Sequence, residues 1–177
     1  IAAQAKVPLG LVQYHFGTKE ELWKACVERA FEDLDAGLQN ALAASSQRAS
    51  RVVFRRLIRG YVRFVAEHTE FIRIMHDEGK RRGSRMRWLA DRHVQPLFER
   101  VTPLVVEAQE SGVLIKDVDP AHFVYTLIGA VGMIFHQSEE CKRITGIDPR
   151  TPAAIEAHSS VVESIFLGEP AVSEEGT

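Results

Sequence analysis

The chain has 177 residues, of which 45% are hydrophobic and 26% are charged, and its formal net charge at pH 7 is −2. This balance allows one or two domains with a hydrophobic core and excludes an intrinsically disordered chain. Because the net charge is close to zero and no apolar run of about eighteen residues is present, any nucleic-acid-binding surface must be local and no membrane-spanning helix is expected.

The first part of the chain predicts three helices in close succession. Residues 1–5 are typical of the end of a helix, and Val7–Phe16 predicts a second, short one. Thr18 begins the third helix, because Thr18 and Glu21 have the spacing of a capping box, and this helix should continue to about Ala44. Its apolar stripe has helical spacing and consists of Trp23, Val27, Ala30, Leu34 and Leu38.

The next helix is expected from Arg51 to His68. Its apolar face consists of Phe54, Leu57, Ile58, Tyr61, Phe64 and Val65. Three arginines, Arg55, Arg59 and Arg63, fall on another face, and we expect them to be solvated because long cationic side chains favour water. A shorter helix should follow at residues 70–77.

A long helix is predicted from Met86 to Ser111, with Gly112 as its stop. Pro96 and Pro103 fall inside this range and predict a kink or a break, because proline lacks the N–H that an α-helix needs.

Two further helices begin with an N-cap residue followed by proline, at Asp119-Pro120 and at Thr151-Pro152. The first is apolar on nearly all sides from residue 123 to 135, so it must be buried on several sides. We interpret the two helices as half of a four-helix bundle between subunits of a homodimer; the alternative is a core within one chain. The predicted dimer interface consists of Phe123, Leu127, Gly129, Ala130, Gly132, Met133, Ile155, Ser159, Val162 and Phe166.

A helix, a tight turn and a short helix at the start of the chain have the outline of a helix-turn-helix, whose second helix enters the major groove. In residues 8–15, Gln13 can pair with adenine and Leu9 can contact a thymine methyl group. Gly10 permits close approach of the backbone, and Phe16 can plug the base of the domain. Side chains that can contact phosphates follow at Tyr14, His15 and Lys19. The predicted DNA-binding residues are Pro8, Leu9, Gly10, Gln13, Tyr14, His15 and Lys19. The alternative is a small hairpin that merely caps a bundle.

The stretch "IAAQAKVPLGLVQYHFGTKEELWKAC" resembles the DNA-binding signature of TetR/AcrR-family transcriptional regulators. The matching residues are Ile1, Ala2, Ala5, Val7, Gly10, Tyr14, His15, Phe16, Lys19, Glu20 and Leu22. The resemblance covers about the first 25 residues. Two positions depart from the pattern: Lys6 replaces the usual turn glycine, so the turn must tolerate a side chain, and Gln13 stands where tyrosine is common.

The resemblance implies an all-α, cytoplasmic homodimer with two domains. Residues 1–46 would form a partial helix-turn-helix DNA-binding domain that lacks the family's first helix, together with a linking helix. Residues 47–177 would form a larger ligand-binding and dimerisation domain. Most members of the family are repressors that leave a palindromic DNA operator when a small molecule binds, and we expect the same here. The sequence identifies neither the effector nor the operator.

The effector pocket is expected among the helices between Arg51 and about His136. Its candidate residues are Phe64, His68, Ile72, Met75, His76, Trp88, Val105, Phe123, Leu127 and Phe135. Ordinary core packing is the alternative for each of them. The basic segment at residues 80–87, "KRRGSRMR", could bind an anion such as a coenzyme A thioester, lie near DNA, or form a solvated loop.

Enzyme signatures are not found. The sequence contains no HExxH, Glu-x-x-His, GxSxG, GxxxxGK[ST] or GxGxxG pattern. Cys26 and Cys141 form no CxxC pair, and we expect them to be reduced core thiols rather than a disulfide or metal ligands. No cofactor or metal is therefore predicted. The alternative function is a helical small-molecule-binding or enzymatic bundle with a purely structural N-terminal hairpin.

Overall fold

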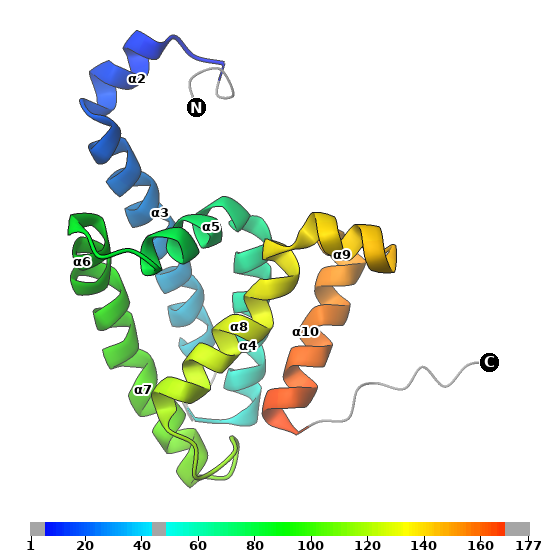
Figure 1. The fold of residues 1–177 in the computed structure, drawn as a ribbon. Coiled ribbons are helices and arrows are strands. Elements are labelled where there is room, and N and C mark those ends of the chain that lie inside the picture. The colour runs from blue at the N-terminus through cyan, green and yellow to red at the C-terminus, as the bar shows by residue number, and fades with distance from the viewer. Residues whose placement is uncertain (1–5, 44–48, 169–177) are drawn as a thin grey trace.

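A computed structural model of the chain describes residues 6–43 and 49–168. All regular structure within these ranges is helical, which confirms the predicted all-α class (Figure 1). The elements are α2 (Leu9–Phe16), α3 (Lys19–Ala43), α4 (Arg51–Glu67), α5 (Thr69–Gly79), α6 (Ser84–Leu89), the π-helical segment η1 (Ala90–Val94), α7 (Gln95–Glu110), α8 (Pro120–His136), α9 (Ser138–Thr145) and α10 (Pro152–Leu167).

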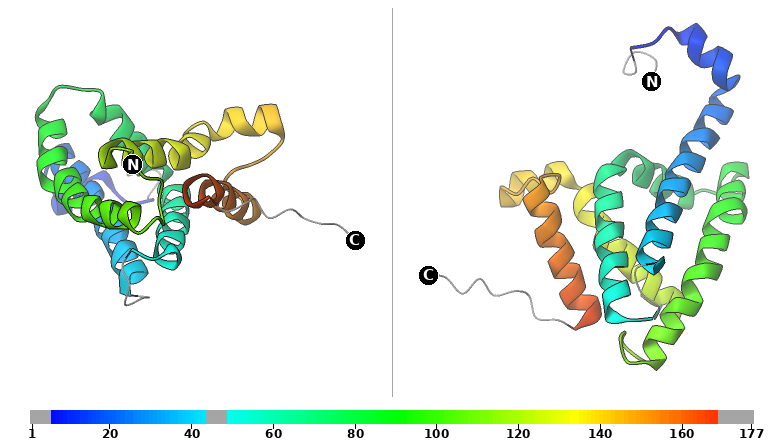
Figure 2. Two further views of the ribbon diagram at one scale, coloured as in Figure 1. Left: turned by 90° about the horizontal axis from the view of Figure 1, so that it is seen from below. Right: turned by 180° about the vertical axis from the view of Figure 1, so that it is seen from behind.

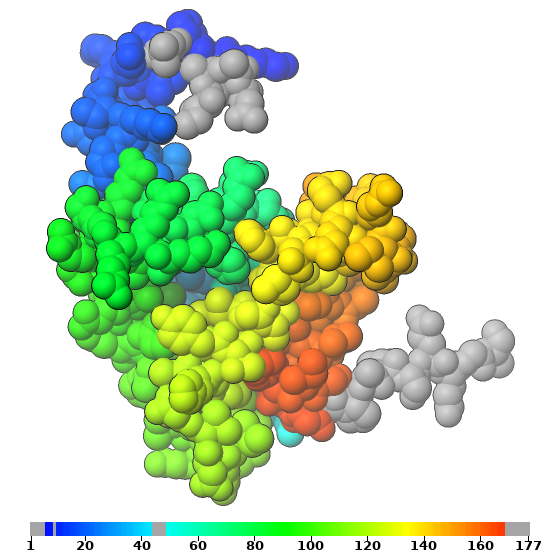
Figure 3. Space-filling model, viewed as in Figure 1, coloured from blue at the N-terminus to red at the C-terminus, as the bar shows by residue number. Residues whose placement is uncertain are grey.

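The helix α3 joins two parts of the molecule. Its first turns carry α2, which lies beyond the other helices at one end of the structure (Figures 1 and 3). Its remaining turns enter the larger body and pack on α4 and α5. The views in Figure 2 show the same arrangement from below and from behind, with α3 beside α4. Any displacement of α3 within the body therefore displaces α2.

The helix α4 lies at the centre of the body, in contact with α3, α8 and α10. Ser50 caps its start, since its side chain accepts a hydrogen bond from the Val53 N–H at 3.4 Å. Ile58, Val62 and Val65 are almost completely buried, as the apolar face of the sequence predicted. Burying each such side chain stabilises the fold by about 1.5–3 kcal/mol.

Two of the three arginines predicted to form a solvated face are also ion-paired, which was not predicted: the Arg55 and Arg59 side chains keep 40% and 32% of their surface but pair with α10. Arg59 lies 3.3 Å from Glu163 on α10 and also pairs with Glu156, while Arg55 lies 3.6 Å from Glu163. The reason is tertiary: α10 packs along this side of α4 and brings the buried carboxylate of Glu163 against both guanidinium groups. The third arginine, Arg63, is exposed.

The predicted long helix passes its first proline, Pro96, without a break, because the residues before it switch from α-helical to π-helical hydrogen bonding. Residues 90–94 are π-helical, and the Gln95 N–H bonds to the carbonyl oxygen of Ala90, five residues earlier. The wider turn accommodates the missing N–H of Pro96 without a break. Pro103 lies inside α7. Gly112 ends the helix as predicted, with a φ of 75°.

The predicted caps of α8 and α10 are confirmed. The Asp119 carboxylate accepts hydrogen bonds from the N–H groups of Ala121 and His122 at 2.9 and 3.2 Å. The Thr151 hydroxyl accepts one from Ala154 N–H at 3.3 Å. Both cap residues are followed by proline at the first helical position, where no N–H is needed.

Candidate functional site

The recognition segment predicted at the N-terminus forms the helix α2 and presents its polar side chains to solvent. Gln13, Tyr14 and His15 are exposed on α2, and Tyr14 keeps 84% of its surface. Lys19, on the first turn of α3, is exposed as well. Pro8 and Gly10 are exposed as well, and the Leu9 side chain lies outside the described part of the structure. These residues are free to contact a large partner.

The turn between α2 and α3 is held by the predicted capping box. The Thr18 N–H donates to Glu21 Oε2 at 2.9 Å, and the Glu21 N–H donates to the Thr18 hydroxyl at 3.1 Å. Gly17 precedes them with a φ of 67°, a conformation that favours glycine. The angle between α2 and α3 is thus fixed by local hydrogen bonds and one left-handed residue.

The turn before α2 tolerates a side chain in a left-handed conformation. Lys6 has a φ of 53°, as expected of a position where glycine would be favoured. The predicted end of the preceding helix, residues 1–5, lies outside the described residues. Phe16, which was expected to plug the domain, keeps 37% of its surface exposed, because the described residues of this region offer only α2 and the start of α3 for packing.

A cavity of about 560 Å³ lies in the body between α3, α4, α5, α7 and α8. Its volume is in the range of small-molecule sites. Most residues predicted for the effector pocket border it, namely Phe64, His68, Ile72, Met75, His76, Val105, Phe123 and Leu127. Trp88 and Phe135 do not: Trp88 packs on the outer side of α6 against α3, and Phe135 is buried against His158 on α10.

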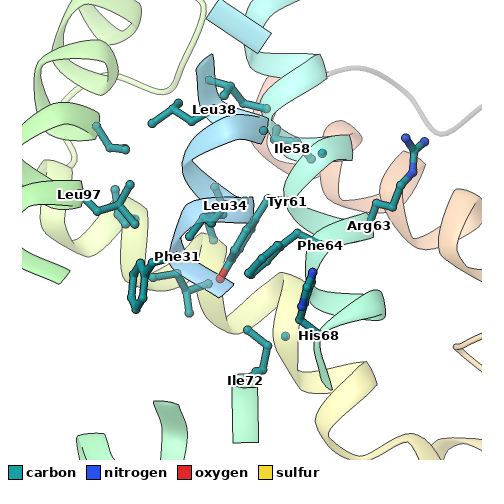
Figure 4. A pocket seen from close by; sticks show the side chains of 18 of the residues that line it. Phe31, Leu34, Leu38, Ile58, Tyr61, Arg63, Phe64, His68, Ile72 and Leu97 are labelled. Carbon is teal, nitrogen blue, oxygen red and sulfur yellow. The ribbon is translucent and has the colours of Figure 1, made fainter. Parts of the chain in front are cut away.

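The cavity has a wall that was not predicted as part of the pocket. Phe31, Leu34 and Leu38 of α3 border it, together with Tyr61 of α4 and Leu97 of α7 (Figure 4). The predicted apolar faces included Leu34, Leu38 and Tyr61, but Phe31 was not predicted on the apolar stripe of α3. The missing information was that α3 runs beside α4, so that both faces enclose the same space.

Polar groups at the cavity are few. Tyr61 projects from α4 with its hydroxyl toward Leu34 and Phe31 (Figure 4). The His68 ring stacks on Phe64 with 4.5 Å between ring centroids. At the α5–α8 side, the His76 ring lies 4.9 Å from that of His136, and burial, followed by the neighbouring His136, lowers the pKa of His76.

Aromatic and charged side chains join the start of α3 to α6. The indole rings of Trp23 and Trp88 lie 5.5 Å apart, and the Lys24 ammonium lies 5.6 Å from the Trp88 ring. The Arg85 guanidinium lies 4.9 Å from the Trp23 ring and 2.6 Å from the Glu20 carboxylate. That carboxylate has a lowered pKa, chiefly through its hydrogen bond to Arg85. The first turns of α3 are thus attached to α6.

Phe31 connects this junction to the cavity. It borders the cavity, stacks on His93 of η1 at 4.6 Å and meets Phe71 of α5 edge-on at 5.4 Å. The His93 ring in turn lies 4.9 Å from Trp88. A continuous series of aromatic contacts therefore runs from the cavity wall to the part of α3 that carries α2.

The residues predicted for a dimer interface differ in how deeply they are buried within the single chain. Phe123, Gly132, Ser159 and Val162 are buried within the single chain, Leu127, Ala130, Ile155 and Phe166 are half-buried, and Gly129 and Met133 are exposed. The buried residues face α4 and the cavity, because α8 and α10 pack inward on α4. Large apolar side chains outside this set are exposed on the same two helices: Tyr125, Val161 and Ile165 keep 63%, 49% and 66% of their surface.

The expectation that both cysteines lie in the core is wrong, although both are free thiols as expected. Cys26 is exposed on α3 beside the core residue Val27, and Cys141 is half-buried on α9. Within the described ranges, no three His, Cys, Asp or Glu side chains gather in a way that could hold a metal ion. The helices described here also fall short of the length and apolarity that a membrane span requires.

Residues 51–165 match the family model described as "Tetracyclin repressor-like, C-terminal domain". The match covers more than half of the chain and extends from the start of α4 almost to the end of α10. It thus includes most of the cavity and the exposed sides of α8 and α10. Comparison with curated proteins gave no match.

Proposed function

The chain belongs to the tetracycline-repressor-like family of transcriptional regulators, and from this premise we propose that it is a repressor that a small molecule releases from a palindromic DNA operator. One observation carries the proposal: α3 borders the cavity and also carries the exposed helix α2. One element therefore belongs to both the ligand-binding and the DNA-binding part.

In the proposed complex, α2 enters the major groove. Gln13 reads a base edge, and Tyr14 and His15 contact phosphates. Lys19 lies on the first turn of α3, where the free N–H groups and the positive end of the helix dipole also favour a phosphate. The exposure of these side chains supports the assignment.

Effector binding would act through the position of α3. This helix has 25 residues and is therefore about 37 Å long, so a small rotation at the cavity becomes a larger displacement of α2. A ligand that pushes on Phe31 would also shift its contacts with His93 and, through Trp88, with Trp23. Ligand and operator would then favour different positions of α3, and each would weaken binding of the other by the same factor.

The operator requires two copies of α2 about 34–36 Å apart on a palindrome. We place the dimer contact on α8 and α10, which lie side by side on the face shown in Figure 3. Exposed apolar side chains on both helices support this placement: Tyr125 and Met133 on α8, and Val161 and Ile165 on α10.

Fluorescence anisotropy with the full-length protein and DNA from upstream of its own gene tests the proposal. We expect a dimer to bind a palindromic site, with an affinity that falls steeply as salt increases. Native mass spectrometry of the purified protein would identify a retained effector, and adding that effector should weaken operator binding about 5–150-fold. Binding without sequence preference at every salt concentration would instead favour a helical bundle with a structural N-terminal hairpin.

A further inference from the structure

Most residues that line the cavity are apolar, and its four charged residues are two acids and two bases. Its charged neighbours, Asp33, Arg56, Arg63 and Glu67, lie on the border with exposed or ion-paired side chains: Asp33 lies 3.1 Å from Arg29, and the other three are exposed. Figure 4 shows the Arg63 side chain directed away from the cavity. Burial also lowers the pKa of His76, which keeps its imidazole neutral at pH 7.

An ionised ligand would meet an unfavourable environment here. A carboxylate or an ammonium group that leaves water without a partner of opposite charge loses several kcal/mol of solvation. The apolar wall contributed by residues such as Leu34, Phe64 and Leu127 offers no such partner. An uncharged apolar ligand, in contrast, gains from contact with this wall.

Tyr61 is a polar residue in the largely apolar wall, as are His68 and His76. Its ring stacks with Phe64 at 6.5 Å between centroids, and its hydroxyl points toward Leu34 and Phe31 (Figure 4). Tyr61 is half-buried and lines the cavity. Burial accordingly raises the pKa of Tyr61 to about 12, so the hydroxyl keeps its proton.

The Tyr61 hydroxyl has no hydrogen-bond partner among the residues at 6–43 and 49–168. No side chain or carbonyl group of these residues lies in hydrogen-bond geometry with it, and Tyr61 lines the cavity, so the hydroxyl is available to a molecule bound there. A protonated phenol donates one hydrogen bond. A ligand oxygen placed in the cavity would accept that bond.

We propose that the cavity binds an uncharged, largely apolar molecule whose carbonyl oxygen accepts a hydrogen bond from Tyr61. This inference rests on the proposed function in so far as the cavity is the effector site, and it specifies the chemistry of the effector. It assigns Tyr61 a role in ligand specificity and assigns the rest of the wall a role in excluding charged molecules.

Three naphthalenes of matched shape test the proposal: 2-acetylnaphthalene, which has a carbonyl acceptor; 2-naphthoate, which is an anion; and 2-ethylnaphthalene, which has no oxygen. Each would compete at pH 7.5 with the uncharged fluorescent ketone 6-propionyl-2-(dimethylamino)naphthalene, whose emission shifts to the blue in an apolar site. We expect the wild-type protein to bind 2-acetylnaphthalene at least about tenfold more tightly than 2-naphthoate, since the anion must be desolvated.

The variant Tyr61→Phe isolates the hydroxyl. It should weaken binding of 2-acetylnaphthalene about 2–13-fold, the equivalent of one hydrogen bond, and change binding of 2-ethylnaphthalene less than about twofold, because the ring remains. Circular dichroism would confirm that the variant folds. Equal effects on both ligands, tight binding of the anion, or no binding of any of the three would each overturn the proposal.

Operator binding measured in the same samples separates this proposal from the proposed function. If 2-acetylnaphthalene binds through Tyr61 but leaves the affinity for the operator unchanged, the ligand chemistry holds and the proposed release mechanism fails. If the operator is bound and released by another molecule while the ketone does not bind, the regulatory function holds and the ligand chemistry is wrong.

Discussion

Gln13 and Lys19 are both exposed near the N-terminus, but their side chains suit different parts of a DNA duplex. We expect Gln13→Ala to relax base preference and to cost about 1–3 kcal/mol on the preferred operator. Lys19→Ala should weaken binding to all sequences alike and reduce the salt slope by about one. Anisotropy titrations on operator and scrambled DNA over a range of salt measure both effects. Similar behaviour of the two variants would contradict the assigned roles.

Gly17 fixes the turn that orients α2. A Cβ atom at this position would lie 2.7 Å from Glu21 Oε2, and the φ of 67° is unfavourable for alanine. Gly17→Ala should therefore loosen the capping box by about 1–2 kcal/mol and speed amide hydrogen exchange in residues 19–24.

Gly37→Ala is the matched control on the same helix. Its Cβ would have no neighbour within 4 Å, so the helix should be stabilised by about 0.5–1 kcal/mol. Unchanged exchange in residues 19–24 of Gly17→Ala would show that the turn does not depend on this glycine.

Tyr61 shows what the sequence can and cannot predict about a single residue. The apolar face of α4 was predicted with Tyr61 on it, but the residue was not among the predicted pocket residues. Helical spacing tells which side of a helix a residue occupies. It does not tell whether that side packs tightly or borders a cavity, which depends on the distance to α3 and α8.

At the scale of elements, α4 and α10 are joined by a charged cluster around Glu163. We expect Arg59→Met to lower the free energy of unfolding by about 2–3 kcal/mol, because it removes a partner of a buried carboxylate. Arg63→Met on the same helix should change it by less than about 0.5 kcal/mol, since the Arg63 side chain is exposed. Urea unfolding of both variants measures the difference, and equal midpoints would contradict it.

Two elements differ from the sequence prediction for local reasons. The helix α9 was not predicted because it is short, polar and contributes no buried residue, so it has no apolar stripe to detect. The π-helical segment before Pro96 was predicted only as a kink or a break, since the sequence shows that an N–H is missing but not how the preceding carbonyl groups are satisfied.

At the scale of the whole molecule, the proposed dimer depends on the outer sides of α8 and α10. Ile165→Arg would place a charge in this apolar face and should shift the protein from dimer to monomer in sedimentation velocity experiments. Ile144→Arg on α9 is the control, because Ile144 is equally exposed, at 73%, but lies outside the proposed interface. A dimer that persists in Ile165→Arg would exclude this face.

Stability should also depend on pH through three half-buried imidazoles. Burial lowers the pKa of His76, His93 and His158, so the folded protein takes up protons less readily than the unfolded chain. The free energy of unfolding should therefore decrease as the pH falls below about 6.5, where unfolded histidines become protonated. Urea unfolding at pH 7.5 and 5.5 measures this, and the difference should be smaller in His158→Gln. Equal stability at the two pH values would contradict the prediction.

The sequence by itself determined the features that depend on local chemistry. Helix caps such as Thr18 and Asp119, the stop at Gly112 and the apolar face of α4 follow from hydrogen bonding and periodicity within a few residues. The first 25 residues resemble the DNA-binding signature of the family. The family model matches a different part of the chain, residues 51–165, and both indicate the same family.

Only the tertiary structure decided which faces meet. It brought Arg59 to Glu163, placed Tyr61 at a cavity bordered by α3, and turned Phe123 and Val162 inward while leaving Ile165 outside. The physical reason is that periodicity marks a side chain as apolar without naming its partner. A core, a cavity wall and a dimer face all require the same apolar residues at the same spacing, and only the packing of the helices distinguishes them.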